Sequence, residues 1–196
     1  MIRTYFNEKA VIWDETVAEK DEIKLESMAE SLDIEFGSVL LDVGTGTGVF
    51  VPYLLKRIGR HGRLVTLDVA EEMLKKARAK NCNGNIECLH ADVTNIPLRN
   101  EIFDIVVCYS SFPHFQDKLR ALNEINRVLK KGGRVIICHT SSRAAINDIH
   151  RQIPAVQNDI IPGEGETQGM LSSAGFTCID IYDNDDSYLA SARKSR

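Results

Sequence analysis

The sequence lacks the features that mark secreted, disulfide-bonded or membrane-spanning proteins. Only five cysteines occur among 196 residues, and no two of them form a Cys-x-x-Cys pair. Scattered cysteines in odd number are typical of reduced thiols and argue against a disulfide framework. No apolar run approaches the length of a membrane span, and the first residues have no signal-peptide core. We therefore expect a cytoplasmic protein without a membrane partner.

A basic surface is also missing from the composition. Lys and Arg total 24 against 28 Asp and Glu, which gives a net charge of -4. Because a phosphate backbone is bound by clustered cations, this balance disfavours a nucleic-acid partner. The histidines show no established ligand spacing, so we expect no metal site. Hydrophobic residues make up 43% of the chain, which suits one soluble α/β domain with a sizeable core.

The most informative stretch is the run from Val39 to Phe50. Its apolar, β-branched beginning predicts a buried parallel strand, and apolar residues recur at helical spacing after it. An acid and three glycines at alternate positions stand between the two, namely Asp42, Gly44, Gly46 and Gly48. Glycine accepts positive φ and lets a ligand approach the backbone closely. The strand, glycine turn and helix together predict a nucleotide-binding site.

The glycine spacing favours one class of cofactor. A dinucleotide-binding turn has Gly-x-Gly-x-x-Gly, but Val49 stands where its last glycine would be. An acid followed by Gly-x-Gly-x-Gly resembles the class I S-adenosylmethionine-dependent methyltransferases, of the small-molecule type with a methyltransferase-11-like core. S-adenosylmethionine (SAM) carries a sulfonium and an ammonium but no phosphate, so an acid beside the glycines suits it. The resemblance implies SAM as cofactor and methyl transfer to a small-molecule substrate.

The resemblance also implies a fold and its division. We expect a Rossmann-like, doubly wound α/β sheet of seven strands in the order 3-2-1-4-5-7-6, with strand 7 antiparallel. Within a single methyltransferase domain (1–196) we expect four parts. These are an N-terminal lid or helical segment (1–36), a SAM-binding core (37–140), a substrate-side helix and loop (141–175) and a C-terminal β-hairpin (176–196).

Two further acids follow predicted strands. Asp68 ends the strand 63–68, twenty residues after Gly48, where a carboxylate can accept hydrogen bonds from both ribose hydroxyls. The alternative is that it caps the predicted helix 70–80. Asp92 follows the strand 85–90, and Asp is also a frequent turn former at such places. The resemblance implies that Asp92 accepts from the adenine amino group.

The cofactor-binding set that the resemblance implies includes hydrophobic residues beside these acids. Val69 and Val93 are expected to sandwich the adenine ring. The complete set is Asp42, Gly44, Thr45, Gly46, Gly48, Asp68, Val69, Asp92, Val93, Cys108 and Tyr109.

A catalytic base is less evident than the cofactor site. The methyl donor is already activated, so the protein mainly aligns and desolvates the reactants. The candidates are His114, His139 and Tyr109, with packing as the favoured alternative for His114. The loop after the strand 103–108 has no Asp/Asn-Pro-Pro-Tyr/Phe pattern, which disfavours amino methylation of nucleic-acid bases. The acceptor atom, whether N, O, S or C, is left open.

Substrate-side candidates come from both flanks of the core. The N-terminal aromatics Tyr5, Phe6 and Trp13 are expected either to face the pocket as a lid or to pack as a surface clasp. Arg143 and His150 belong to a predicted helix that begins after Ser141 or Ser142 at a strand end. A guanidinium there can bind a carboxylate, and the alternative is an ordinary solvated helix.

The remaining elements are predicted from periodicity and turn residues. Helices are expected at 17–32, 119–130 and 166–174, the second of them ending at Lys130-Lys131-Gly132-Gly133. A loop is expected at 152–165. Strands are expected at 134–138, 176–182 and 187–194, and the short turn between the last two makes them antiparallel.

Two alternative functions remain open at the level of sequence. A nicotinamide-dependent reductase would need Gly-x-Gly-x-x-Gly and usually Tyr-x-x-x-Lys, and the sequence has neither. A SAM-binding domain with a regulatory role would keep the cofactor residues without transferring a methyl group.

Overall fold

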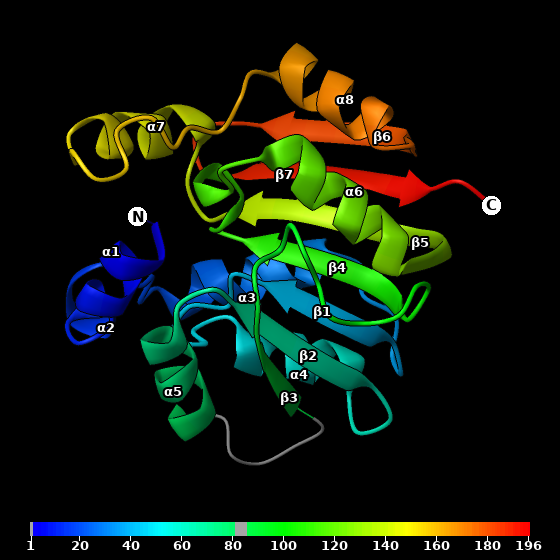
Figure 1. Cartoon of the computed structure of the whole chain (residues 1–196), viewed down its shortest axis with the longest axis horizontal. Coiled ribbons are helices and arrows are strands. Elements are labelled where there is room, and N and C mark those ends of the chain that lie inside the picture. Colours follow the sequence, from blue (N-terminus) through cyan, green and yellow to red (C-terminus); the bar gives the residue numbers. More distant parts are fainter. Residues whose placement is uncertain (1, 81–85) are drawn as a thin grey trace.

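The computed structural model describes residues 2–80 and 86–196. Cys82 and Asn85, the latter at the start of the predicted third strand, lie outside the described residues. Seven strands form one sheet in the order β3-β2-β1-β4-β5-β7-β6 (Figure 1). Their bounds are β1 Val39–Val43, β2 Arg63–Asp68, β3 Ile86–His90, β4 Phe103–Tyr109, β5 Leu129–His139, β6 Phe176–Asp183 and β7 Tyr188–Lys194.

Strand pairing confirms the predicted fold class and order. Strands β3, β2, β1, β4 and β5 are mutually parallel, whereas β7 pairs antiparallel with both β5 and β6. The helices are α1 Ile2–Lys9, α2 Trp13–Thr16, α3 Glu22–Ser31, α4 Val51–Ile58, α5 Glu71–Lys80, α6 Lys118–Val128, α7 Arg143–Arg151 and α8 Glu164–Ser173, with a 3-10 turn, η1, at Phe112–His114.

Each face of the sheet is covered by its own hydrophobic core. One core contains Leu41, Val106 and Ile137 together with residues of α6 and α8. The other contains Leu40, Val107 and residues of α3 and α4. Neighbouring strand residues alternate between the two cores because successive side chains of a strand point to opposite faces. The central strands are therefore buried on both sides, as parallel sheets require.

This arrangement positions a site at one edge of the sheet. Strands β1 and β4 lie side by side at the centre, and the chain leaves them toward different strands, which makes this the topological switch point. In open parallel sheets, ligands bind beyond the carboxyl ends of the strands at this point. Helices α1, α2 and α7 gather at that edge, on the left of Figure 1.

The predicted boundary between the helix 119–130 and the strand 134–138 is wrong. Helix α6 ends at Val128, and Leu129 adopts an extended backbone with ψ 139°. Leu129 pairs with Phe103, so β5 begins there and continues through the Lys-Lys-Gly-Gly segment. Gly132 has φ +76°, which fits glycine within a strand that shifts its register rather than a helix terminus.

Two other predicted helix boundaries also differ from the structure. The helix expected at 17–32 starts at Glu22, because Asp21 caps it by accepting from the backbone N–H groups of Ile23 and Lys24. The helix expected at 166–174 starts at Glu164, immediately after Gly163, which shortens the preceding loop. Ser142 caps α7 by accepting from Ala145, as predicted for this serine pair.

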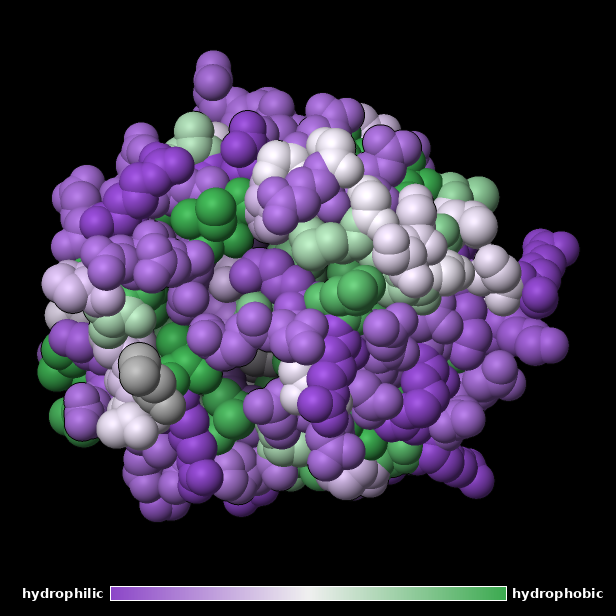
Figure 2. Space-filling model, turned by 45° about the horizontal axis from the view of Figure 1, so that its top comes forward, coloured by the Kyte–Doolittle hydropathy of each residue, from purple (hydrophilic) through white to green (hydrophobic). Residues whose placement is uncertain are grey.

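The surface and the cysteines show no sign of a membrane span or a disulfide among the described residues. None of the helices in the described parts of the chain combines the length and the hydrophobicity that crossing a bilayer requires. Cys88, Cys108, Cys138 and Cys178 are free thiols. The face shown in Figure 2 is mostly hydrophilic, and its hydrophobic side chains form separate patches. This face therefore presents no single extended apolar docking surface.

Candidate functional site

A pocket of about 240 Å³ lies at the carboxyl ends of the strands. Its wall is formed by the glycine turn after β1, the ends of β2 and β3, the loop after β4, the N-terminal helices, and one residue each of α5 and α6. The lining residues are Ile2, Phe6, Trp13, Val43, Gly44, Gly46, Leu67, Asp68, Val69, Met73, Ala91, Asp92, Val93, Thr94, Ser110, Ser111, His114, Phe115, Gln116, Asp117 and Arg120. The structure thus brings together six of the cofactor-binding candidates at one cavity.

The glycine turn needs two of its glycines for different reasons. Gly44 has φ +73°, and a Cβ on it would lie 2.4 Å from Cβ of Ser111. Gly46 has φ +55°, but a Cβ there would meet no atom within 4 Å. Gly44 therefore permits close packing against the loop after β4, whereas Gly46 leaves open space beside the pocket.

We expect Gly44→Ala to destabilise the protein more than Gly132→Ala. Both glycines have nearly the same positive φ, +73° and +76°, so alanine meets a similar backbone strain of about 1–2 kcal/mol at each. Only at Gly44 does the new methyl group also collide with Ser111, which adds roughly 1–3 kcal/mol. Urea unfolding of the two variants measures the difference. Equal losses of stability would contradict the close packing of the turn.

Asp68 is a buried carboxylate that joins two parts of the pocket wall. Its Oδ2 accepts from the backbone N–H of Gly46 at 2.8 Å, and its Oδ1 accepts from that of Ala70 at 2.8 Å. Burial raises the pKa of Asp68, and the backbone donors oppose that rise. The Ala70 bond anchors the start of α5, and each oxygen keeps a further lone pair for a ligand. Both sequence interpretations of Asp68 are therefore compatible with its geometry.

Asp42 lies behind the turn and is only 2% exposed. Burial raises its pKa to about 7, the nearby Thr45 hydroxyl opposes this rise, and the charge of Asp68 adds to it. Two buried acids close to one another favour a cation between or beside them, since each carboxylate is destabilised by the other. Asp42 and Thr45 are not among the lining residues, so they act on the pocket from behind its wall.

The adenine candidates all line the pocket. Asp92 lines the pocket, and its Oδ1 accepts from both the backbone N–H and the hydroxyl of Thr94 at 2.8 Å. Asp92 therefore forms the turn that its position after a strand predicts. Val69 and Val93 also line the pocket, together with Met73 of α5, which the sequence analysis did not select. These side chains make an apolar wall suited to a flat ring.

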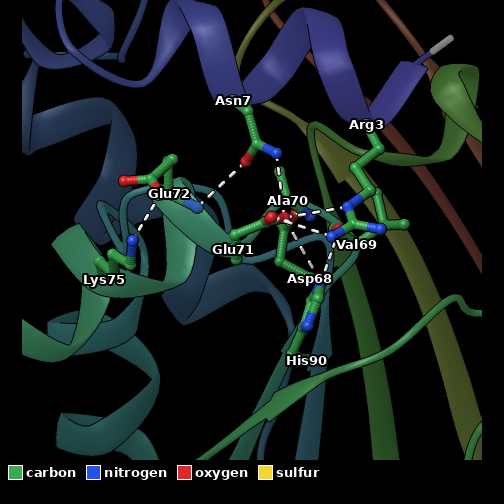
Figure 3. A network of polar contacts seen from close by, with 9 residues as sticks. All are labelled: Arg3, Asn7, Asp68, Val69, Ala70, Glu71, Glu72, Lys75 and His90. Atoms are coloured by element: carbon green, nitrogen blue, oxygen red, sulfur yellow. Dashed lines mark hydrogen bonds and ion pairs between the residues drawn. The ribbon is translucent and has the colours of Figure 1, made fainter.

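The N-terminal helix α1 is attached to the first turn of α5 by polar contacts (Figure 3). Arg3 donates two hydrogen bonds of 2.9 Å to the carboxylate of Glu71. Asn7 donates to Glu71 at 2.9 Å and accepts from the backbone N–H of Glu72 at 3.0 Å. The Arg3 guanidinium holds the pKa of Glu71 well below its usual value. These contacts hold α1, and with it Phe6, beside α5. Phe6 and Trp13 line the pocket and pack edge-on against one another, whereas Tyr5 packs edge-on against Phe6 outside the pocket.

We expect Arg3→Ala to free the N-terminal helices without changing global stability. The pair with Glu71 is exposed, and such pairs contribute little to the free energy of unfolding, yet this one, together with the bonds of Asn7, fixes α1 on α5. Hydrogen exchange of residues 2–16 should become several-fold faster. Lys75→Ala is the control, since Lys75 pairs with Glu72 on the solvent side of α5. Unchanged exchange in both variants would show that α1 is held by other contacts.

Several predicted site residues do not line the pocket. The Cys108 side chain is fully buried in the core that packs on α6, because its position in β4 points it there. Tyr109 stacks on Phe50, with ring centroids 4.2 Å apart, and its hydroxyl lies 3.0 Å from that of Thr140. Burial raises the pKa of Tyr109 to about 12, which makes it a poor acid or base near neutral pH. Gly48 does not line the pocket either, but its φ of +79° shows that it takes part in the turn as a glycine with left-handed backbone.

The candidates from β5 and α7 do not line the pocket. Arg143 does not face the pocket, because its guanidinium binds Asp183 of β6 at 2.7 Å. His139 is 1% exposed, and its burial lowers its pKa to about 3. His150 donates through Nδ1 to the backbone carbonyl of Asp159. Within the described residues, no group of three or more His, Cys, Asp or Glu side chains is placed to hold a metal ion.

His114 is the one catalytic candidate that lines the pocket. Its Nδ1 lies 2.9 Å from Oδ2 of Asp159, and its ring packs edge-on against Phe6. Asp159 was not predicted, because it lies 45 positions away in a segment that the sequence marks only as a loop. The lining residues Ser110, Ser111, Gln116, Asp117 and Arg120 were also not predicted. Their place in the loop after a central strand was the available signal.

The residues present fit SAM. Gly46 leaves the space that a ligand needs near the backbone, and Asp68 offers acceptors at the end of β2. The buried acids suit a sulfonium and an ammonium, and the wall of Val69, Val93 and Met73 suits a purine. A sheet of this order with this turn and these acids defines the fold of class I SAM-dependent methyltransferases.

Comparison with known proteins agrees with this class. Residues 41–137 match the family described as a methyltransferase domain, and the chain belongs to the class I SAM-dependent methyltransferases. A solved structure from Thermotoga maritima, described as a SAM-dependent methyltransferase and possible histamine N-methyltransferase, superposes over the whole of both chains. Its TM-score is 0.80 at 18% identity, which establishes the shared fold alone.

Two curated relatives are similar over part of their length. Demethylmenaquinone methyltransferase of Staphylococcus haemolyticus is 35% identical over 125 residues, 63% of this chain and 52% of that protein. The ubiquinone/menaquinone biosynthesis C-methyltransferase of Klebsiella pneumoniae is 28% identical over 174 residues, 74% of this chain and 69% of that protein. The chain thus spans about half the length of the first of these relatives.

Proposed function

We propose that the chain transfers the methyl group of SAM to a hydroxylated aromatic ring of the reduced-quinone type, at a ring carbon. The observation that carries this proposal is the pocket in which Gly46, Asp68 and Asp92 meet His114 beneath Phe6 and Trp13. The two quinone-methylating relatives support the acceptor class. The aromatic side chains of the N-terminal helices suit a flat, apolar acceptor.

Each part of the pocket wall has a role in this proposal. Asp68 accepts from the ribose hydroxyls, Asp92 accepts from the adenine amino group, and Val69 with Val93 encloses the ring. When bound, SAM supplies a methyl carbon attached to a positively charged sulfur. Asp42 and Asp68 stabilise positive charge in the bound molecule, because both lie buried behind or beside the turn. Phe6 and Trp13 exclude water from the reacting groups.

The test is methylation of a short-chain 2-alkyl-1,4-naphthoquinol by the purified protein under reducing conditions. Release of S-adenosylhomocysteine, together with mass-spectrometric detection of a ring-methylated product, is the expected result. Binding of S-adenosylhomocysteine without methylation of this or related quinols would overturn the proposed acceptor and favour a regulatory SAM-binding role. Absence of any binding would overturn the assignment of the pocket.

A further inference from the structure

A hydrogen-bonded pair of side chains, His114 and Asp159, lies at the wall of the pocket. His114 ends the 3-10 turn η1 after β4, and Asp159 belongs to the segment between α7 and α8. Their side chains are each only 14% exposed, with His114 Nδ1 and Asp159 Oδ2 2.9 Å apart. Among the described residues, His114 Nε2 has no hydrogen-bond partner, and the residue lines the pocket. The imidazole thus has one nitrogen held by a carboxylate and the other available.

The segment that carries Asp159 is fixed to α7. The buried side chain of Asn147 donates to the carbonyl of Ile161 at 3.0 Å and accepts from the N–H of Ile161 at 2.8 Å. His150, also on α7, bonds the backbone carbonyl of Asp159 itself. Opposite them, Lys118 donates to the carbonyls of Pro113 and Phe115, which holds η1. Both members of the pair are therefore held in place by contacts outside the pocket.

We infer that His114 is the general base of the reaction and that Asp159 is its positioning residue. The inference rests on the proposed function, and it deepens it: the acceptor is one that gives up a hydroxyl proton when it is methylated. A carboxylate on Nδ1 fixes the tautomer that carries hydrogen there and a lone pair on Nε2. A base held in this way by a third group is the usual arrangement for activating a nucleophile.

The proposed step balances without any further reactant. His114 Nε2 takes the proton of the acceptor hydroxyl, and the freed electron pair moves through the ring so that a ring carbon bonds the methyl carbon. The carbon–sulfur bond breaks, and its electron pair stays on sulfur. The proton on His114 then returns to the oxygen as the methylated ring carbon loses its own proton to solvent. One proton is released for each methyl group transferred.

The surroundings of His114 favour its neutral form, which is the form that can accept a proton. Burial lowers its pKa, Asp159 opposes this, and the charges of His150 on α7 and Lys118 on α6 lower it further. The other neighbour from a packed element is the apolar ring of Phe6 on α1, with the buried His139 of β5 close enough to interact electrostatically. Removing the Asp159 charge should lower the pKa of His114, so the acid limb of the rate profile should move to lower pH.

The test compares His114→Gln, Asp159→Asn and the control His61→Gln, whose imidazole packs edge-on against Phe36 away from the pocket. Each is assayed with the naphthoquinol probe from pH 5 to 9 alongside its affinity for S-adenosylhomocysteine. His114→Gln should lower kcat by roughly 10²–10⁴-fold and abolish the acid limb, with cofactor affinity unchanged. Asp159→Asn should lower kcat less and shift that limb to lower pH. A wild-type kcat and acid limb in His114→Gln would overturn the inference.

A second measurement keeps this inference separate from the proposed acceptor. In ¹⁵N-labelled protein saturated with S-adenosylhomocysteine, NMR of the imidazoles should show hydrogen on Nδ1 of His114 at neutral pH. Asp159→Asn should weaken that preference and lower the pKa of the ring. Hydrogen on Nε2 in the wild-type protein would overturn the pair as a base. A wild-type protein inert toward the quinol, with the Nδ1 tautomer present, would count against the proposed acceptor alone, and the pair would stand.

Discussion

Replacing Asp68 with asparagine is expected to weaken the binding of S-adenosylhomocysteine by about two orders of magnitude. The carboxylate already bonds the backbone N–H groups of Gly46 and Ala70. An amide keeps only one acceptor oxygen, so its NH₂ group would face either a backbone donor or a ribose hydroxyl. Charge-assisted hydrogen bonds are worth ~1.5–3 kcal/mol each, and ~2.7 kcal/mol corresponds to a hundredfold change in Kd. Isothermal titration calorimetry measures the Kd for S-adenosylhomocysteine in the wild-type protein and the variant.

Asp104→Asn provides the matched control for this experiment. Asp104 lies near the start of β4, at the opposite edge of the sheet, where it pairs with Lys130 and accepts from the N–H of Val39. Its replacement should leave the affinity for S-adenosylhomocysteine unchanged. Equal affinities in Asp68→Asn and Asp104→Asn would show that the end of β2 does not carry the ribose contacts.

Replacing Asp42 with asparagine is expected to stabilise the ligand-free protein, and the gain should grow as pH rises. Burial raises the pKa of Asp42 to about 7 in the folded protein, against about 3.9 in an unfolded chain. The folded state therefore binds the proton more tightly, so stability falls as pH rises from about 4 to 7 and is level above that. Asparagine is neutral throughout and removes this dependence.

Urea unfolding of wild type and Asp42→Asn between pH 5 and 8 measures the effect. The difference in unfolding free energy should widen by roughly 2–3 kcal/mol over that range, because one pKa unit corresponds to about 1.4 kcal/mol. Asp104→Asn again serves as the control, because it removes a carboxylate at the opposite end of the strands. A constant gap between wild type and Asp42→Asn would mean that the carboxyl is not buried as described.

The cofactor side of the pocket was readable in the sequence because each residue there follows a strand. Gly46, Asp68 and Asp92 lie at or within three residues of the carboxyl ends of three parallel strands, and parallel strands place these ends at one edge of the sheet. Chain order therefore fixes their spatial neighbourhood without any knowledge of side-chain packing. The strand order came from the resemblance to the methyltransferase family, and only the antiparallel pairing of the last two strands followed from the short turn between them.

The acceptor side depends on contacts between distant segments, which local patterns do not encode. Arg143 has the charge of an anion-binding residue and a place after a strand end. Its guanidinium instead donates to the carboxylate of Asp183, 40 positions later. Asp159 reaches His114 because Asn147 of α7 bonds the backbone of Ile161 and so holds the segment that carries Asp159. The predicted end of the helix 119–130 was wrong for a related reason. Leu129 pairs with Phe103 of a distant strand, and this pairing overrides the helical tendency of the residues that follow.

The bonds around Asp68 and Glu71 have a thermodynamic consequence. Asp68 holds the glycine turn and the start of α5, and three residues later Glu71 holds α1 through Arg3. We therefore expect a ligand bound by Asp68 to steady α1 as well, and linkage makes such an effect mutual. Whatever factor the docking of α1 on α5 adds to the affinity for that ligand, the ligand adds to the docking, so we expect α1 to be held least firmly in the ligand-free protein.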